Sequence, residues 1–247
     1  MKKWLEKMDW IYVIVPLALL GTFWVIAAFT GQWPWQSNPY NSYALQTDSW
    51  LKGRLDLGQD YPWLELAIYQ GKYFVSFPPF PSYVLIPFVM IFGANTPDHL
   101  IALFVTIAGC VYAIKLYREV SFEKEHALFW VLMLYFASGY LFVGMNGYVW
   151  FIAQSMSFTL SLMALYYALR QKGGLSLAFW ACAVGCRPML ALYGILLVYL
   201  LVKGYKKENP KGTVWQLVKD KWYCPFFECL NKSTAAIPFF AQSQAAP

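Results

Sequence analysis

A long polar stretch between apolar segments carries four carboxylates, Asp48, Asp56, Asp60 and Glu65. A carboxylate can accept the proton of a sugar hydroxyl as that oxygen attacks, provided that it lies within hydrogen-bond reach. Asp48 is the first candidate for such a base, because it lies at the border of a predicted amphipathic helix and can face a cleft. A solvated charge on the helix surface is the alternative. Glu65 is a candidate second acid or metal ligand, whereas Asp56 and Asp60 fit turn and capping positions better.

Arg187 is a further candidate, because it is a charged residue inside apolar sequence. An arginine at the centre of a bilayer costs about 3 kcal/mol on insertion scales. Such a side chain usually extends to the lipid headgroups or meets an anion, and both interpretations apply here. The guanidinium could hold a lipid phosphate through its two-pronged hydrogen bonding. Lys52 and Lys72 would add positive charge to the same site.

Other kinds of chemistry find little support in the residue pattern. The sequence has no glycine-rich phosphate-binding loop and no nucleophilic serine or cysteine motif. His99 and His126 stand apart from other ligand-type residues, and the five cysteines follow no metal-binding pattern. The identity of any metal therefore stays unknown, and a divalent ion is left open.

The composition is that of a membrane protein. Hydrophobic residues make up 59% of the 247 positions and charged residues 13%, whereas soluble domains have about 25% charged residues. A net charge of +6 would suggest nucleic acid as the partner of a soluble protein, but the basic residues here flank apolar runs. We therefore expect an all-α polytopic membrane protein, multi-pass in a cell membrane, without a nucleic-acid partner.

Basic residues near the N-terminus predict that this end lies in the cytoplasm. The apolar run 11–29 is long enough to cross the hydrocarbon core, and we interpret it as a retained first helix. It leads into a large extracytoplasmic loop of about residues 30–98. This loop should contain a surface-lying helix at 41–52, and a short hairpin that turns at Gln70-Gly71.

About six crossings are expected in total. The segment 84–92 is too short to span and contains Pro87, so it should lie at the surface or re-enter the membrane. The predicted crossings are 11–29, 99–114, 127–143, 149–169, 175–183 and 191–202. The last two meet at Arg187 and should form a helical hairpin whose tip lies near the outer face.

The pattern changes near residue 208. Residues 1–207 form the predicted transmembrane region, and 208–247 has no spanning run and no clear period. Two interpretations compete for this irregular segment. It is either a genuine cytoplasmic tail or the end of a chain cut short before further membrane helices, and we favour the second.

Together these features resemble the GT-C glycosyltransferases, the multispanning class that includes protein O-mannosyltransferases and the lipid A aminoarabinose transferase. The resemblance rests on the order of four segments along residues 10–204 and covers the N-terminal part of such enzymes. These segments are TDSWLKGRLDL, GKYFVSFPPFP, GYVWFIAQ and VGCRPML.

The resemblance implies transfer of a sugar, with inversion, from a polyprenyl-phosphate donor to a glycan, lipid or protein acceptor outside the cell. Asp48 would be the base, and Arg187, loop lysines such as Lys72 or a divalent metal would stabilise the departing lipid phosphate. A bacterial plasma membrane is the implied location.

Two positions depart from the class. Its acidic residue often comes soon after the first helix, where this chain has Ser37-Asn38-Pro39-Tyr40-Asn41 without a carboxylate. Asp48 is therefore the nearest match to that acid. The aminoarabinose transferases have lysine-glycine-proline in the later hairpin, where this chain has Arg187-Pro188.

Two other functions are open at this stage. A polytopic transporter or lipid flippase would place charged residues along its path, but Arg187 is nearly alone and no inverted repeat is visible. An inactive scaffold subunit, or a truncated product, is the other alternative, and the irregular C-terminal segment favours it.

Overall fold

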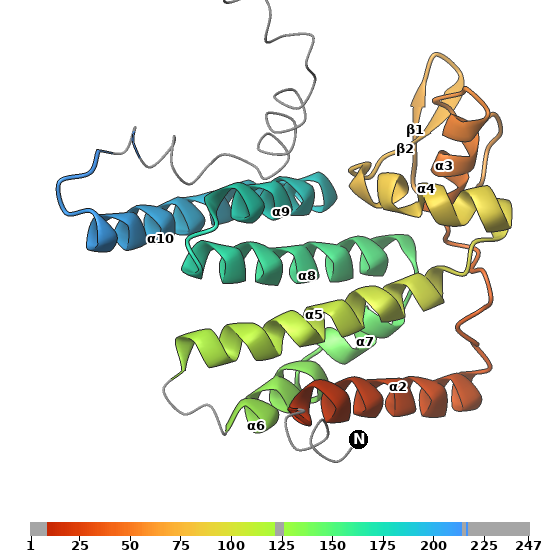
Figure 1. Cartoon of the computed structure of the whole chain (residues 1–247). Helices are drawn as coiled ribbons and strands as arrows, with labels where there is room; N and C mark the ends of the chain where they lie inside the picture. Colours follow the sequence, from red (N-terminus) through yellow and green to blue (C-terminus); the bar gives the residue numbers. More distant parts are fainter. Residues whose placement is uncertain (1–8, 122–125, 214–215, 217–247) are drawn as a thin grey trace, which may run out of the picture.

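The computed structural model describes residues 9–121, 126–213 and 216, and it is almost entirely helical (Figure 1). Two short strands interrupt the helices between α3 and α4. The elements run α2 (Ile11–Thr30), α3 (Ser42–Leu51), β1 (Leu66–Tyr69), β2 (Lys72–Val75), α4 (Phe80–Phe92), η1 (Gly93–Asn95), α5 (Asp98–Val120), α6 (Ala127–Leu132), η3 (Met133–Ala137), α7 (Tyr140–Met145), α8 (Val149–Leu169), α9 (Gly173–Cys186), η4 (Pro188–Leu192) and α10 (Tyr193–Glu208).

Four of the described helices are long and apolar enough to cross a membrane. They are Ile11–Thr30, Asp98–Val120, Val149–Leu169 and Pro188–Glu208. Large apolar side chains point outward along them, such as Phe29, which is 88% exposed, and Ile195, which is 72% exposed. Water would penalise such a surface whereas lipid does not, so the expectation of a helical membrane protein is confirmed at this level.

The predicted crossings 175–183 and 127–143 correspond to shorter apolar helices. Gly173–Cys186 is too short to count as a candidate span, and the other segment breaks at Ser138. There the Ser138 hydroxyl donates to the Leu134 carbonyl (2.5 Å) and accepts from the Tyr140 amide (3.1 Å). The hydroxyl thus replaces backbone hydrogen-bond partners where the helix ends after the π-turn η3. The next helix, α7, begins at Tyr140.

The central layer is formed by α5 and α8, which pack along one another (Figure 1). On one side α5 packs against α2 and α6, and on the other side α8 packs against α9. Tyr135, with none of its surface exposed, packs in one core with Val15 and Ile114. These contacts hold α2, α5 and α8 in a fixed relation.

The polar loop folds into a cap at one end of the bundle, made of α3, the β1–β2 hairpin and α4 (Figure 1). Gln70 (φ 50°) and Gly71 (φ 71°) form the hairpin turn, as predicted. The helix α3 agrees with the predicted 41–52 helix, and buried hydrogen bonds fix it on α4, including Thr47 Oγ1 to the Ser82 carbonyl (2.9 Å). Tyr43 of this helix is buried, whereas Leu51 at its end is 48% exposed.

At the end of the bundle that carries the cap, Gly147, between α7 and α8, lies against the first residues of α5. A Cβ at this position would overlap the Asp98 carbonyl carbon and the His99 nitrogen. Both are backbone atoms of a helix start, so neither can move aside as a side chain would.

We therefore predict that Gly147→Ala lowers the free energy of unfolding by about 1–3 kcal/mol through overpacking. Thermal unfolding in detergent, followed by circular dichroism, measures the change. Gly21→Ala is the matched control, because a Cβ at Gly21 meets nothing within 4 Å inside α2. An unchanged melting temperature in Gly147→Ala would contradict this account of the junction.

Candidate functional site

Asp48 lines a polar pocket of about 200 Å³ in the cap, which we call the Asp48 pocket. The side chain comes from the last turn of α3, and it faces the loop that connects α3 with β1. Lys52, Arg54 and Tyr61 are among the residues that line the pocket with it. The pocket therefore offers one carboxylate, two cationic groups and a phenol to a ligand.

A short ion pair dominates this pocket. The Lys52 ammonium lies 2.5 Å from the Asp48 carboxylate, one helical turn away. Asp48 has 22% of its side chain exposed and Lys52 has 60%. Because an exposed lysine is held only weakly by such a pair, its side chain can swing out and leave the carboxylate accessible.

The bend after α3 depends on two glycines in the left-handed region. Gly53 (φ 73°) follows the end of α3, and Gly58 (φ 78°) lies directly against the Arg54 guanidinium. The positive φ favours glycine at both positions. The Arg54 side chain is exposed and flexible, so its contact with Gly58 adds little to that preference.

Arg187 directly follows α9, which packs against α4 of the cap as well as against α8. Its side chain is half-buried, and Nη2 donates to the Trp150 carbonyl at 2.7 Å. The guanidinium has five N–H groups, and this bond uses one of them. The group therefore keeps donors for an anion.

Tyr43 of α3 lies near Arg187, within range of its charge. Burial raises the pKa of the Tyr43 phenol, and the Arg187 guanidinium partly opposes that rise. Only 2% of Tyr43 is exposed, and its hydroxyl has no hydrogen-bond partner among the described residues. The Tyr43 hydroxyl is therefore a buried polar group that feels the Arg187 charge.

Asp48 and Arg187 adjoin the same helix but line no common pocket among the described residues. Asp48 faces the pocket at the C-terminal end of α3, whereas Arg187 lies by Tyr43 near its start. The two groups share an end of the bundle and are separated along α3.

The other predicted site residues lie on the hairpin side of the cap. Lys72, 63% exposed, has its ammonium 3.8 Å from the Asp56 carboxylate. Glu65 is exposed just before β1, and its backbone carbonyl accepts from the Ser76 hydroxyl (3.0 Å). Neither Lys72 nor Glu65 lines the Asp48 pocket.

The structure offers no cluster of metal-binding side chains around Glu65 among the described residues. Within the described ranges, no group of three or more His, Cys, Asp or Glu side chains could hold a metal ion. The divalent ion suggested by the resemblance stays a prediction.

Asp98 is a buried acid that was not among the candidates from the sequence. It is 2% exposed, and its Oδ2 accepts from the Asn38 amide at 2.8 Å. The same amide also reaches the Gly147 carbonyl at 3.3 Å, so Asn38 links the loop after α2 to two other segments. An acid in the first turn of α5 is favoured by the helix dipole. Its place at the start of a predicted span was the sequence feature that pointed to Asp98.

We predict that Asn38→Leu destabilises the protein, because it leaves the buried Asp98 carboxyl without its donor. An unsatisfied buried polar group costs about 1–3 kcal/mol. The double variant Asn38→Leu/Asp98→Leu removes both partners and should recover part of that loss. Melting temperatures of the two single variants and the double variant measure the coupling. Strictly additive losses would contradict a direct Asn38–Asp98 interaction.

No protein-family model, no curated protein and no solved structure matches this chain.

Proposed function

We propose that this protein is a membrane glycosyltransferase that uses a polyprenyl-phosphate-linked sugar. One observation supports the proposal: a carboxylate pocket and a half-buried guanidinium adjoin the same short helix, α3, at one end of a bundle with four described helices long and apolar enough to cross a membrane. A lipid-linked donor needs both groups at one membrane surface. On this proposal, that surface is the outer face of a bacterial plasma membrane, and the N-terminus is cytoplasmic.

Asp48 would act as the general base. An acceptor hydroxyl would enter the Asp48 pocket, displace the exposed Lys52 ammonium and donate its hydrogen bond to the carboxylate. The acceptor could be a glycan, a lipid or a protein, because the pocket contacts only the attacking hydroxyl and its neighbours.

Arg187 would hold the phosphate of the donor. The guanidinium has donors left after its bond to the Trp150 carbonyl, and the unpaired Tyr43 hydroxyl lies within reach of the same charge. Charge that accumulates on the leaving phosphate would be stabilised there. The half-buried setting makes this stabilisation larger than it would be in water.

The reaction proposed here inverts the anomeric centre. Inversion requires the nucleophile and the leaving group on opposite faces of the sugar, so Asp48 would act on the acceptor side of the ring and Arg187 on the phosphate side. The acceptor oxygen would form a bond to the anomeric carbon while the bond from that carbon to the phosphate oxygen breaks. The hydroxyl proton goes to Asp48, and polyprenyl phosphate leaves.

We predict that Asp48→Asn lowers transfer by at least about 100-fold, because general base catalysis typically contributes 10²–10⁴-fold. The assay incubates membranes with a panel of radiolabelled polyprenyl-phosphate sugars and measures label in the acceptor fraction. Asp60→Asn, which changes an exposed carboxylate of the same loop, is the control and should keep wild-type transfer.

Two outcomes would count against this assignment. Wild-type transfer in Asp48→Asn would remove Asp48 from the role of base. A wild-type protein that moves labelled lipid across the membrane without covalent transfer would favour a flippase instead.

We predict that Arg187→Gln reduces kcat/KM for the lipid-linked donor by about ten- to a hundredfold. A hydrogen bond to a charged group contributes about 1.5–3 kcal/mol, which converts to that range. Arg187→Lys should recover part of the loss, since it keeps the charge without the two-pronged geometry. Arg170→Gln is the matched control, because Arg170 lies after the opposite end of α8, near Glu119. Equal losses in Arg187→Gln and Arg170→Gln would contradict a specific role of Arg187.

A further inference from the structure

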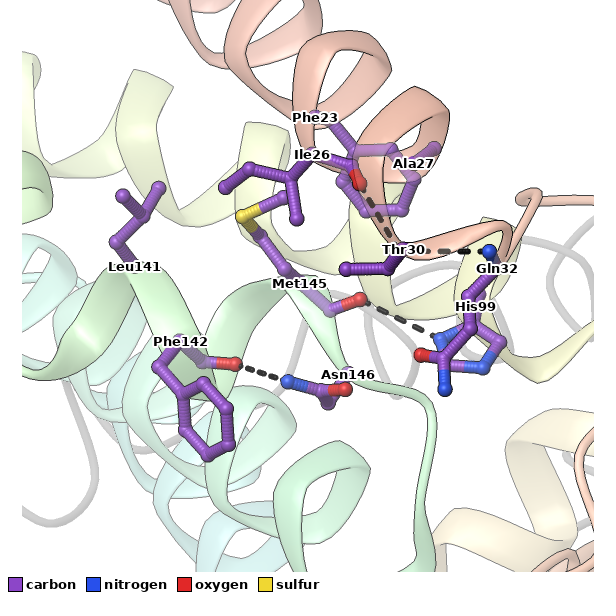
Figure 2. Close-up of a pocket in the computed structure, with 10 residues that line it drawn as sticks. All are labelled: Phe23, Ile26, Ala27, Thr30, Gln32, His99, Leu141, Phe142, Met145 and Asn146. Atoms are coloured by element: carbon purple, nitrogen blue, oxygen red, sulfur yellow. Dashed lines mark hydrogen bonds between the residues drawn. The ribbon is translucent and has the colours of Figure 1, made fainter.

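A second pocket of about 230 Å³ lies between α2 and α7 beside the start of α5 (Figure 2). We call it the α2–α7 groove. Phe23 and Ile26 of α2 form one wall, and Phe142 and Met145 of α7 form the other. It is separate from the Asp48 pocket and shares no lining residue with it.

The walls of this groove are open toward the lipid. Ile26 is 36% exposed and Phe142 is 62% exposed, whereas Phe23 at the base is 3% exposed. Because α2 is a candidate membrane span, a lipid chain can enter the groove from the side. The volume is smaller than a typical pocket for a whole ligand, so only one end of a lipid fits inside.

Polar groups close one end of the groove. Figure 2 shows Gln32, His99 and Asn146 at this end, with the apolar side chains extending away from them. A tryptophan cluster follows α2 beside this region: the stacked rings of Trp33 and Trp35 lie 5.1 Å apart. Tryptophans of this kind mark the headgroup level of a membrane.

The hydrogen bonds of the rim determine what it can offer. The Gln32 amide nitrogen donates to the Tyr148 hydroxyl (3.0 Å), and the Asn146 amide nitrogen donates to the Phe142 carbonyl (2.7 Å). These bonds orient both amides and leave their oxygens as acceptors.

His99 lies beside these two amides at the rim. Its Nδ1 accepts from the Gly147 amide at 3.1 Å, which places the proton of the neutral ring on Nε2. With Nδ1 as an acceptor, its 3.4 Å approach to the Met145 carbonyl is a contact without a hydrogen bond. The two amide oxygens are therefore the acceptors that the rim offers.

A hydroxyl group matches this inventory, because it can donate its hydrogen bond to one of these oxygens. A phosphate does not match it, because two acceptor oxygens would face its negative charge and none of the described residues that line the groove is lysine or arginine. We propose that the α2–α7 groove binds the hydroxyl-bearing head and the adjoining chain segment of a neutral single-chain lipid, of the monoacylglycerol class. This site does not depend on the proposed transferase activity.

The test uses the full chain in phosphatidylcholine nanodiscs with a monoacylglycerol that carries a photoactivatable diazirine near its head. Crosslinked peptides are mapped by mass spectrometry. We expect labelling concentrated on α2 from Phe23 to Thr30 and on α7, and competition by unlabelled monoacylglycerol. A probe whose hydroxyls are methylated loses the donated bond and should label about fivefold less.

Two substitutions on α2 provide a matched pair. Ile26→Trp fills the groove and should abolish the competed labelling, whereas Val25→Trp adds the same side chain at a position 55% exposed outside it. Melting temperatures of both variants show whether either is unfolded. Equal labelling of the two variants would overturn the proposal. So would equal or stronger labelling by a diazirine alkyl phosphate, or labelling spread evenly over α2 and α10, which would indicate general lipid contact.

Discussion

The hydrogen bond between Asn38 and the buried Asp98 carboxylate is the interaction on which the arrangement of the cap depends. It joins the loop after α2 to the start of α5, and Gly147 closes against the same helix start from the α7–α8 connection. Three segments distant in sequence therefore meet at one point. The Val149 amide adds a bond to the Tyr40 carbonyl (3.2 Å), so the chain that leads into α3 is tied to the start of α8 as well. This junction fixes the chain that leads into α3, and α3 itself is held by its bonds to α4 and by the packing of Tyr43 in the core.

The membrane explains why this junction can be polar at all. Along the spans a buried acid would be costly, but at a helix N-terminus the dipole and free amide groups favour a negative or strongly polar side chain. The polar contacts of the cap gather at the same end of the bundle, where α2 finishes and α5 and α8 begin. Apolar surface dominates the sides instead, with residues such as Leu17 and Tyr199 more than half exposed. The sides of the bundle thus carry apolar residues suited to lipid, and the capped end carries polar residues suited to water.

Much of the fold could be predicted from local pattern. The helix α3 follows from the amphipathic spacing of its residues, and the turn at Gln70-Gly71 follows from residues that tolerate positive φ. The long spans follow from apolar length alone. The break at Ser138 could not be predicted in this way, because a serine inside an apolar run is compatible with a helix until its hydroxyl competes for backbone bonds. The pairing of Asn38 with Asp98 joins residues 60 positions apart, and no local signal encodes such a contact.

The candidate sites show the same limit more sharply. A search for carboxylates in the loop finds Asp48 and a search for charge in apolar sequence finds Arg187, but the relation between them depends on how α3 is docked. That docking uses buried polar bonds to α4 and the packing of Tyr43 in the core with Leu85 and Ile152. Rotation of α3 about its axis would carry Asp48 and Tyr43 to new surroundings together, because both belong to one rigid helix of ten residues. The spacing between Asp48 and the surroundings of Arg187 is therefore a property of α3 and its docking, and sequence patterns within the loop alone do not contain it.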